Sequence, residues 1–235
     1  MFKARYSIPQ RLKQTCLQRG ISVLNLKIKK DPYKICNDPS INNQEFDYVV
    51  IGGGSAGISS AIKAQQLGLK TLLFDFVEPS HQGSKWGIGG TCVNVGCVPK
   101  KLFHQASIFP ELEKNSEFFG FEATDPKPFS WPSLVNSVQL HIKKTNFDMA
   151  GGLNTENSQY ANAMACYIDE NTILYSPDSE QIKHFVSTGE ILDPKKVGKV
   201  RTKYSLISVG GRPNTLSEEE CPGSVNAITS DDIFL

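Results

Sequence analysis

The pattern of apolar and polar positions changes abruptly at Phe46. Residues 48–51 (YVVI) form a β-branched apolar run of the kind that fills a parallel strand buried on both faces. Apolar residues recur at helical spacing through 58–67, and Gly68 stands where a helix would end. Because a second apolar run follows at 72–74 (LLF), the pattern predicts a strand, helix, strand crossover unit.

Farther along the chain, the pattern predicts one more helix and several short strands. Apolar positions follow a helical repeat from Ser133 to Phe147. Short β-favouring runs at 173–175, 184–186 and 204–207 alternate with polar turns, and the polar stretch 190–203 fits a loop and an edge strand. The expected fold is therefore α/β and Rossmann-like, with a parallel sheet and an antiparallel β-meander.

The composition is typical of a soluble globular protein. Hydrophobic residues make up 39% of the chain and charged residues 21%, and a net charge of +1 gives no reason to expect nucleic acid or an acidic membrane as a partner. No apolar run approaches the roughly 18 residues of a membrane-spanning helix. The six cysteines include no CxxC pair, which argues against a secreted disulfide framework or a metal site and favours a reducing compartment.

The first 30 residues contain eight basic side chains and no Asp or Glu. That composition is typical of an organellar transit peptide, although a disordered basic extension has the same character. Residues 31–45 are polar and mixed, as in a linker. We therefore expect a basic extension and linker over 1–45 and a folded domain over 46–235.

Residues 52–57 (GGGSAG) form a G-x-G-x-x-G pattern between the predicted strand and the predicted helix. There Gly52 permits a tight turn, Gly54 lets the backbone approach a pyrophosphate, and Gly57 allows close helix–strand packing. The anion would rest on the helix N-terminus. Asp75 ends the second predicted strand, where it can accept hydrogen bonds from ribose hydroxyls. The pattern predicts a bound dinucleotide, but its spacing does not distinguish FAD from NAD.

Two cysteines, Cys92 and Cys97, stand five positions apart at a predicted helix start. On a regular helix this spacing gives about 7.5 Å of rise, which exceeds the Cα separation of about 7 Å that an unstrained disulfide allows. A bridge would need a distorted first turn and would be easily reduced, and Lys100 and Lys101 nearby would stabilise a thiolate. The alternative is two buried free cysteines in a packed helix.

With 89–101 (GGTCVNVGCVPKK) following the glycine turn, the chain resembles the pyridine nucleotide-disulfide oxidoreductases, the family of glutathione reductase, dihydrolipoamide dehydrogenase and thioredoxin reductase. The resemblance implies bound FAD, with Cys97 facing the flavin, Cys92 as the interchange thiol and Lys100 near the flavin ring. It also implies NADPH as the electron donor. The cofactor-binding residues expected from the turn and the resemblance together are Gly52, Gly54, Ser55, Ala56, Gly57, Asp75, Phe76, Gly90, Thr91, Cys92, Gly96, Cys97, Lys101, Ala165 and Gly210.

The stretch 74–90, with its long spacer, its Asp-Phe pair and Trp86, looks like the large, animal-type thioredoxin reductase branch, although Trp86 could equally be a core aromatic. The likeness continues to the end of the chain. By this resemblance we expect electrons to pass from NADPH through FAD to the cysteine pair and on to a thioredoxin-like protein disulfide. The resemblance also implies that members of the family are homodimers, although the domain that forms their interface is not found in this sequence. We expect a cytoplasmic or mitochondrial location.

The sequence departs from the family pattern after the glycine turn. No second G-x-G-x-x-G occurs downstream, and the family's His-Glu pair and dimer-interface domain are not found. The FAD-binding domain is therefore expected to be incomplete, without the NADPH and interface domains. This leaves three alternatives open: a catalytically silent FAD-binding fragment, a truncated gene product, or a glutathione reductase-like enzyme.

Overall fold

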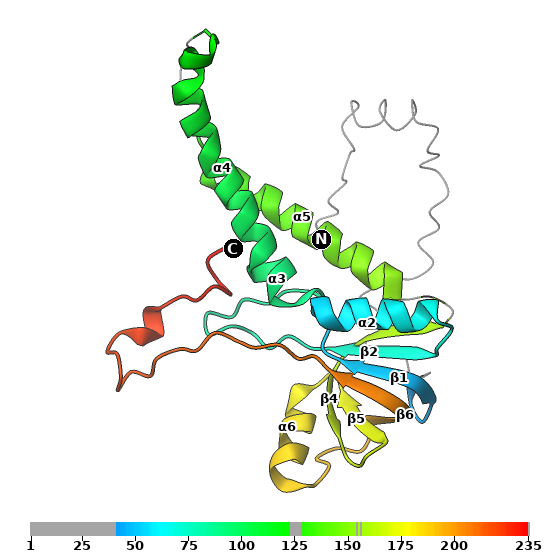
Figure 1. The fold of residues 1–235 in the computed structure, drawn as a ribbon. Helices are drawn as coiled ribbons and strands as arrows, with labels where there is room; N and C mark the ends of the chain where they lie inside the picture. Colours follow the sequence, from blue (N-terminus) through cyan, green and yellow to red (C-terminus); the bar gives the residue numbers. More distant parts are fainter. Residues whose placement is uncertain (1–40, 123–127, 154, 156, 235) are drawn as a thin grey trace, which may run out of the picture. The chain divides into compact units, whose positions relative to one another are not determined.

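The computed structural model describes residues 41–122, 128–153, 155 and 157–234 (Figure 1). The basic extension expected at residues 1–30 lies outside the described residues. The elements along the chain are β1 (Glu45–Ile51), α2 (Ser55–Gln66), β2 (Thr71–Asp75), α3 (Gly90–Val95), α4 (Cys97–Asn115), η3 (Ser116–Phe119), α5 (Trp131–Leu153), β3 (Ser158–Asn162), β4 (Met164–Tyr167), β5 (Thr172–Ser176), α6 (Ser179–Thr188), β6 (Gly198–Ile207) and η4 (Ser224–Asn226).

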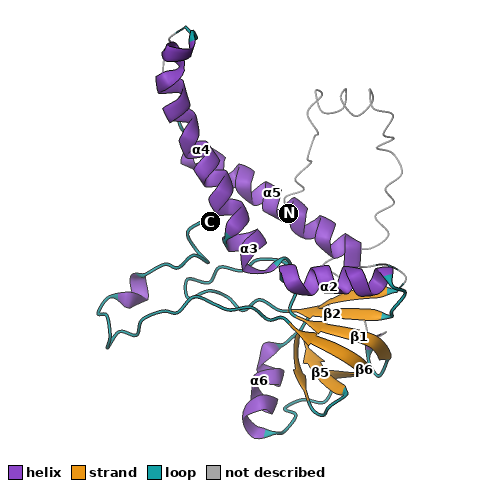
Figure 2. Ribbon diagram, in the orientation of Figure 1, coloured by secondary structure: helices purple, strands orange, loops and turns teal. Residues whose placement is uncertain are grey.

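Six strands of the described residues form one sheet in the order β3-β2-β1-β6-β5-β4 (Figure 2). β1 pairs in parallel with β2 and with β6, and β2 pairs in parallel with β3. β4, β5 and β6 are joined by antiparallel pairs. The predicted α/β fold, with a parallel sheet and an antiparallel meander, is confirmed.

Two local expectations were wrong. The run 184–186, expected as a strand, lies inside α6, whose first turn is capped by the Asp178 side chain and which ends at Gly189 in the left-handed conformation. Ile182 of this helix is buried and Phe185 is half-buried, whereas Val186 is exposed, and a three-residue run cannot distinguish the helical period from that of a strand. The strand expected at an edge within 190–203 is the start of β6, which lies between β1 and β5 inside the sheet.

The central strands β1 and β2 are largely buried on both faces, which explains their uninterrupted apolar runs. On one face, Val50 and Leu73 are fully buried beneath α2 and α5 (Figure 1). On the other face, Phe74 packs against Tyr175 with ring centroids 5.1 Å apart. Burial of each such side chain contributes about 1.5–3 kcal/mol of transfer free energy. Ile41 is also buried in this core, so the packing extends a few residues into the segment read as a linker.

The segment that follows β6 returns beside the loop between β2 and α3 (Figure 1). The Asp232 carboxylate accepts hydrogen bonds from the hydroxyls of Ser80 and Ser84 in that loop, the second at 2.7 Å. Near the end of the chain the Phe234 ring lies 5.3 Å from the Phe103 ring of α4. These contacts hold the segment after β6 against the β2–α3 loop and α4, on either side of the cysteine motif.

Candidate functional site

The glycine turn joins the end of β1 to the start of α2, and its three motif glycines meet different surroundings. Gly52 has φ +111°, and a Cβ there would lie 2.2 Å from the carbonyl oxygen of Ser208. A Cβ on Gly57 would lie 1.9 Å from the Gly52 oxygen. At Gly54, by contrast, the nearest atom is the Cα of Gly90 at 3.9 Å. Gly52 and Gly57 are therefore required by the fold, whereas Gly54 leaves open space in front of the helix.

The first turn of α2 is suited to an anion. Gly54 occupies its N-cap position, no side chain caps the turn, and no acidic residue lies in it. Backbone N–H groups at a helix start carry partial positive charge and bind phosphates when no side chain satisfies them. Ser55 and Ala56 are exposed there, as a ligand lying against the turn requires. The open space and the uncapped helix together fit the pyrophosphate of a dinucleotide.

Asp75 lies at the carboxyl end of β2, beside the glycine turn. Its carboxylate accepts a hydrogen bond from the Gly53 N–H at 2.8 Å. Burial raises the pKa of this carboxyl above its ordinary value, and the hydrogen bonds from the Gly53 and Phe76 backbones oppose that rise only in part. The carboxylate is therefore an under-solvated acceptor, which is suited to the hydroxyls of a ribose.

Asp75→Asn should stabilise the ligand-free chain near neutral pH while weakening the binding of the dinucleotide that the sequence predicts. Because the pKa of Asp75 is higher in the folded chain than in the unfolded chain, protonation of Asp75 favours folding. This stabilisation is complete below the unfolded-state pKa of about 3.9 and is lost as the pH rises through the folded-state pKa. The amide carries no charge to desolvate, so the variant should melt a few degrees higher than the unaltered chain near pH 7.5 and show less advantage near pH 4. The dinucleotide, FAD by the sequence resemblance, should bind about tenfold more weakly, because one charged acceptor is lost.

Thermal melts at the two pH values and a fluorescence titration with FAD measure both effects. A variant that melts below the unaltered chain at neutral pH would contradict the assigned cost of burying Asp75.

A second glycine turn, formed by Gly89 and Gly90, packs directly against the first. The Gly89 N–H donates a hydrogen bond to the Gly53 oxygen at 2.9 Å. A Cβ on Gly90 would lie 2.8 Å from the Cα of Gly54. Both residues have positive φ, +116° and +67°, which favours glycine. The first glycine turn and the start of the cysteine motif are thus held in contact.

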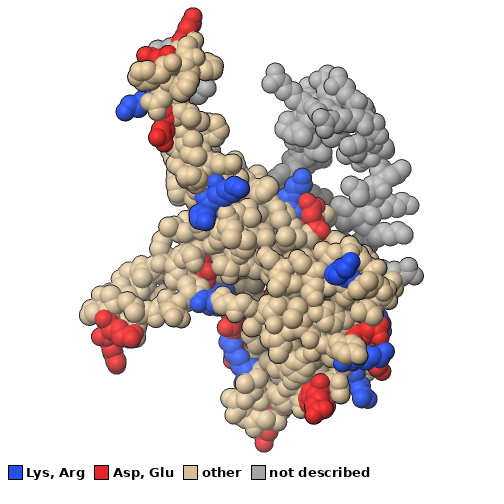
Figure 3. Space-filling model, in the orientation of Figure 1, with Lys and Arg blue, Asp and Glu red and all other residues tan. Residues whose placement is uncertain are grey.

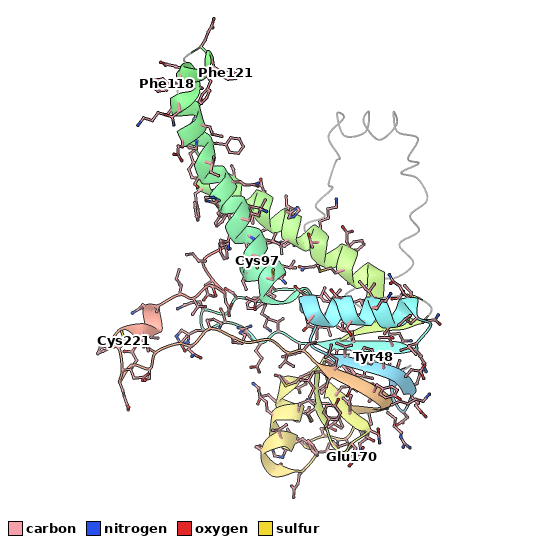
Figure 4. All side chains as sticks on the ribbon, viewed as in Figure 1. Tyr48, Cys97, Phe118, Phe121, Glu170 and Cys221 are labelled. Atoms are coloured by element: carbon pink, nitrogen blue, oxygen red, sulfur yellow. The ribbon has the colours of Figure 1, made fainter. Side chains whose placement is uncertain are left out.

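The two cysteines lie on separate helices that meet at Gly96. Cys92 is in α3 and Cys97 begins α4, and between them Gly96 leaves the helical conformation with φ −139° and ψ −111°. This break is the distortion that the five-residue spacing requires. Cys92 is half-buried and Cys97 is exposed, at the base of α4 in Figure 4.

The side chains of the two cysteines interact with each other. The pKa of the Cys92 thiol is raised, first by a hydrogen bond with the Cys97 side chain and then by burial. Lys100 lowers it, as expected for a nearby cation, but by less than the hydrogen bond raises it. The two thiols therefore lie close enough to influence each other's ionisation, as a dithiol that closes to a disulfide requires.

The remaining predicted residues surround this centre at different distances. Thr91, Lys100 and Lys101 are exposed, and Phe76 and Ala165 are half-buried. Gly210 lies three residues beyond the end of β6, in open space.

A cavity of about 300 Å³ lies beside Asp75. Trp86, Lys143, Tyr160 and Asn162 are among the residues that line it. Its mixture of aromatic and amide groups suits part of a nucleotide.

Sequence reasoning missed Ser208. Its hydroxyl donates to the Gly52 oxygen at 3.1 Å, and its N–H donates to the Ile51 oxygen at 2.8 Å. It therefore fixes the first glycine turn from the neighbouring strand. The available signal was its place immediately after the apolar run 204–207, at the carboxyl end of a strand.

The sequence left open whether Trp86 is a core aromatic or part of the site. In the structure a cationic side chain stacks on its ring. The Arg212 guanidinium lies 4.5 Å from the centre of its ring, and the same Arg212 forms an ion pair with the buried Asp231 at 3.1 Å. This stack links the loop before the cysteine motif to the segment after β6, and such pairs contribute about 0.5–1 kcal/mol at partly exposed sites.

Charged side chains of both signs are scattered over the face drawn in Figure 3, with no single basic or acidic patch. Within the described part of the chain, no helix has the length and apolar character needed to cross a bilayer.

Comparisons with known proteins agree with this geometry. A sequence model of the family described as pyridine nucleotide-disulphide oxidoreductase matches residues 46–234. The chain is 43% identical over 191 residues to a protein named thioredoxin reductase from Plasmodium falciparum (isolate FCH-5), a match that covers 81% of this chain and 32% of that protein. It is 42% identical over 195 residues to thioredoxin reductase 2, mitochondrial, of Drosophila melanogaster, covering 81% and 34%. The chain therefore spans about a third of the length of these relatives.

Proposed function

The chain belongs to the pyridine nucleotide-disulphide oxidoreductase family, and from this premise we propose that it binds FAD and carries the redox-active dithiol of a thioredoxin reductase-like enzyme. The observation that carries the proposal is the hydrogen bond from Gly89 to Gly53, which joins the cysteine motif to the phosphate-binding turn. The open space at Gly54, the uncapped start of α2 and the Asp75 carboxylate all fit the cofactor.

Each of these groups has a distinct task in the proposed reaction. The N–H groups at the start of α2 hold the pyrophosphate, and Asp75 accepts hydrogen bonds from the ribose. Bound FAD supplies two-electron chemistry between NADPH and the disulfide. The protein contributes the position of the two sulfurs and the local charge that governs their ionisation.

The Cys92–Cys97 disulfide takes up two electrons and two protons and becomes two thiols. The Cys92 thiolate then attacks a thioredoxin-like protein disulfide, which forms a mixed disulfide and releases one thiol of the acceptor. Cys97 attacks that mixed disulfide at Cys92, which releases the second thiol of the acceptor and restores the Cys92–Cys97 bond. The pKa of Cys92 is raised, chiefly by the hydrogen bond with the Cys97 side chain, and Lys100 opposes that rise and so favours the attacking thiolate.

A reductive titration of the full chain with FAD tests this proposal. The purified protein is incubated with FAD, freed of excess cofactor and titrated anaerobically with dithionite. We expect about four electrons per bound FAD, two for the cofactor and two for the Cys92–Cys97 couple. A folded chain that stays colourless with added FAD, or that takes up only two electrons, would reject the proposal.

A flavin-binding chain without turnover of its own is the alternative. No second G-x-G-x-x-G occurs in the sequence after residue 57, so the residues that follow contain no evident NADPH-binding motif. An assay of NADPH oxidation by the full chain separates the two, with oxidised thioredoxin and glutathione disulfide as parallel acceptors. Turnover excludes the silent alternative, and the preferred acceptor distinguishes a thioredoxin reductase-like enzyme from a glutathione reductase-like one.

A second copy of the chain is the proposed structural partner. Apolar side chains at the far end of α4 and in the turn beyond it are exposed, including Phe118 at 88% and Phe119 at 79%, and Figure 4 shows this end remote from Cys97. Exposed apolar surface of this kind favours association. A strictly monomeric chain in analytical ultracentrifugation would contradict a dimer. A cytoplasmic or mitochondrial location remains a prediction, and one of the relatives is named as mitochondrial.

A further inference from the structure

Two asparagines, Asn94 of α3 and Asn146 of α5, form a buried amide pair beneath the second glycine turn. Only 2% of Asn94 and 3% of Asn146 is exposed. The Asn146 amide nitrogen donates to the Asn94 side-chain oxygen at 3.0 Å and also to the carbonyl oxygen of Ile88. Leaving the polar atoms of a side chain buried to this degree without hydrogen bonds costs free energy, so the hydrogen bonds of these two asparagines constrain the structure.

Nearly all of the hydrogen-bond acceptors of this pair are carbonyl oxygens of residues 87–90, the segment that contains the second glycine turn. The Asn94 amide nitrogen lies 3.1, 3.2 and 2.9 Å from the oxygens of Gly87, Ile88 and Gly90. The fit is close, because a Cβ on Gly87 would lie 2.9 Å from the Asn146 side-chain oxygen. The pair therefore fixes the direction of the carbonyls along residues 87–90.

The same peptides connect the turn to its other neighbours. The Ile88 carbonyl and the Gly89 N–H belong to one peptide group. That N–H donates a hydrogen bond to the Gly53 oxygen at 2.9 Å. Because a peptide is planar, fixing the carbonyl on one side aims the N–H on the other. The amide pair thus sets how the turn meets the phosphate-binding turn, and Cys92 follows only two residues after Gly90.

We propose that Asn146 is a positioning residue for the Cys92–Cys97 pair, acting from α5 through Asn94 and the turn 87–90. This inference rests on the proposed use of the two cysteines as a redox couple. Cys97 is carried by α4, whereas Cys92 is carried by the six-residue α3, which the amide pair ties to α5. Holding α3 in place raises the effective concentration of one thiol at the other and so favours the closed disulfide.

Thiol–disulfide exchange in the full chain tests the inference without any cofactor. In a glutathione buffer, the two thiols give two electrons and two protons to oxidised glutathione, producing the Cys92–Cys97 disulfide and two molecules of reduced glutathione. Alkylation of the remaining thiols and peptide mass spectrometry measure the equilibrium constant. We expect Asn146→Ala to lower that constant about tenfold, which is about 30 mV for a two-electron couple.

Val138→Ala is the matched control, because Val138 lies on the same helix and is equally buried at 3% exposure. It should lower the melting temperature and leave the exchange constant within twofold of the unaltered chain. An unchanged constant in Asn146→Ala, or an equal change in Val138→Ala, would overturn the positioning role.

Hydrogen exchange provides a readout that does not depend on the disulfide. The peptide covering 87–95 should exchange about tenfold faster in Asn146→Ala than in Val138→Ala, because the turn is no longer held. Equal exchange in the two variants would overturn the inference. If the unaltered chain forms no Cys92–Cys97 disulfide, the proposed function fails, and the exchange rates alone then decide the role of Asn146.

Discussion

A chain carrying Gly54→Ala should fold as stably as the unaltered chain and bind FAD about 100-fold more weakly. Gly54 has φ −79°, which alanine adopts without strain, and the nearest atom to an added Cβ is Gly90 Cα at 3.9 Å. In the proposed complex the cofactor pyrophosphate fills the space that this methyl group would enter. Losing charge-assisted hydrogen bonds of about 1.5–3 kcal/mol accounts for a change of this size, since each 1.4 kcal/mol is about tenfold.

Two further alanine variants make the Gly54 result interpretable. Gly57→Ala should lose both stability and FAD, because its Cβ would lie 1.9 Å from the Gly52 oxygen, inside the packing of α2 on β1. Gly151→Ala, in α5, meets no atom within 4 Å and should bind FAD normally. Thermal melts and flavin fluorescence titrations give both quantities. Unaltered FAD affinity in Gly54→Ala would show that no pyrophosphate lies against this turn.

Replacing either cysteine of the motif should abolish disulfide reduction, with opposite optical consequences. Cys97→Ala and Cys92→Ala should each lower dithiol transfer about 1000-fold or more, because neither remaining thiol can close a disulfide within the chain. By the proposed roles, reduced Cys92→Ala with FAD keeps a long-wavelength thiolate–flavin absorption from Cys97, and Cys97→Ala shows none. The reverse pattern of absorption would exchange the two roles.

Cys97→Ala should also change the ionisation of the thiol that remains. Its hydrogen bond is the largest cause of the raised pKa of Cys92, so the pKa of Cys92 should fall towards the ordinary value, where Lys100 still favours the thiolate. The rate of iodoacetamide labelling of Cys92 against pH measures this. Cys221, exposed and remote in Figure 4, is the internal reference, and its labelling should not differ between the variants.

Local patterns in the sequence were enough for the first βαβ unit. The run 48–51, the glycines and Asp75 are close in sequence and each follows a rule that depends on neighbouring residues, and the structure has β1, α2 and β2 in these places. The helix expected from Ser133 to Phe147 is found as the longer α5, Trp131–Leu153, because helix ends depend on packing that a periodic pattern does not contain.

The errors arose where a short run had no neighbours to decide its conformation. Residues 184–186 favour a strand by composition, yet the Asp178 cap and Gly189 enclose them in α6. The polar alternation of β6 resembles an edge strand, but β6 pairs with β5 over Gly198–Arg201 and with β1 over Arg201–Ile207. Intrinsic preference is weak beside the free energy of pairing and burial, so the sheet decides in such cases.

The sequence by itself determined the motifs from which the function of this protein is proposed: a glycine turn, an acidic residue at the end of the next strand, and a cysteine pair whose spacing requires a broken helix. Only the tertiary structure decided how these parts meet. Ser208 and Gly52 are 156 positions apart, and Asn94 and Asn146 are 52 apart, so no local pattern could pair them. Their contacts depend on the order of strands in the sheet and on the helices packed against it, which bring distant backbone groups within hydrogen-bonding distance once the apolar faces are buried.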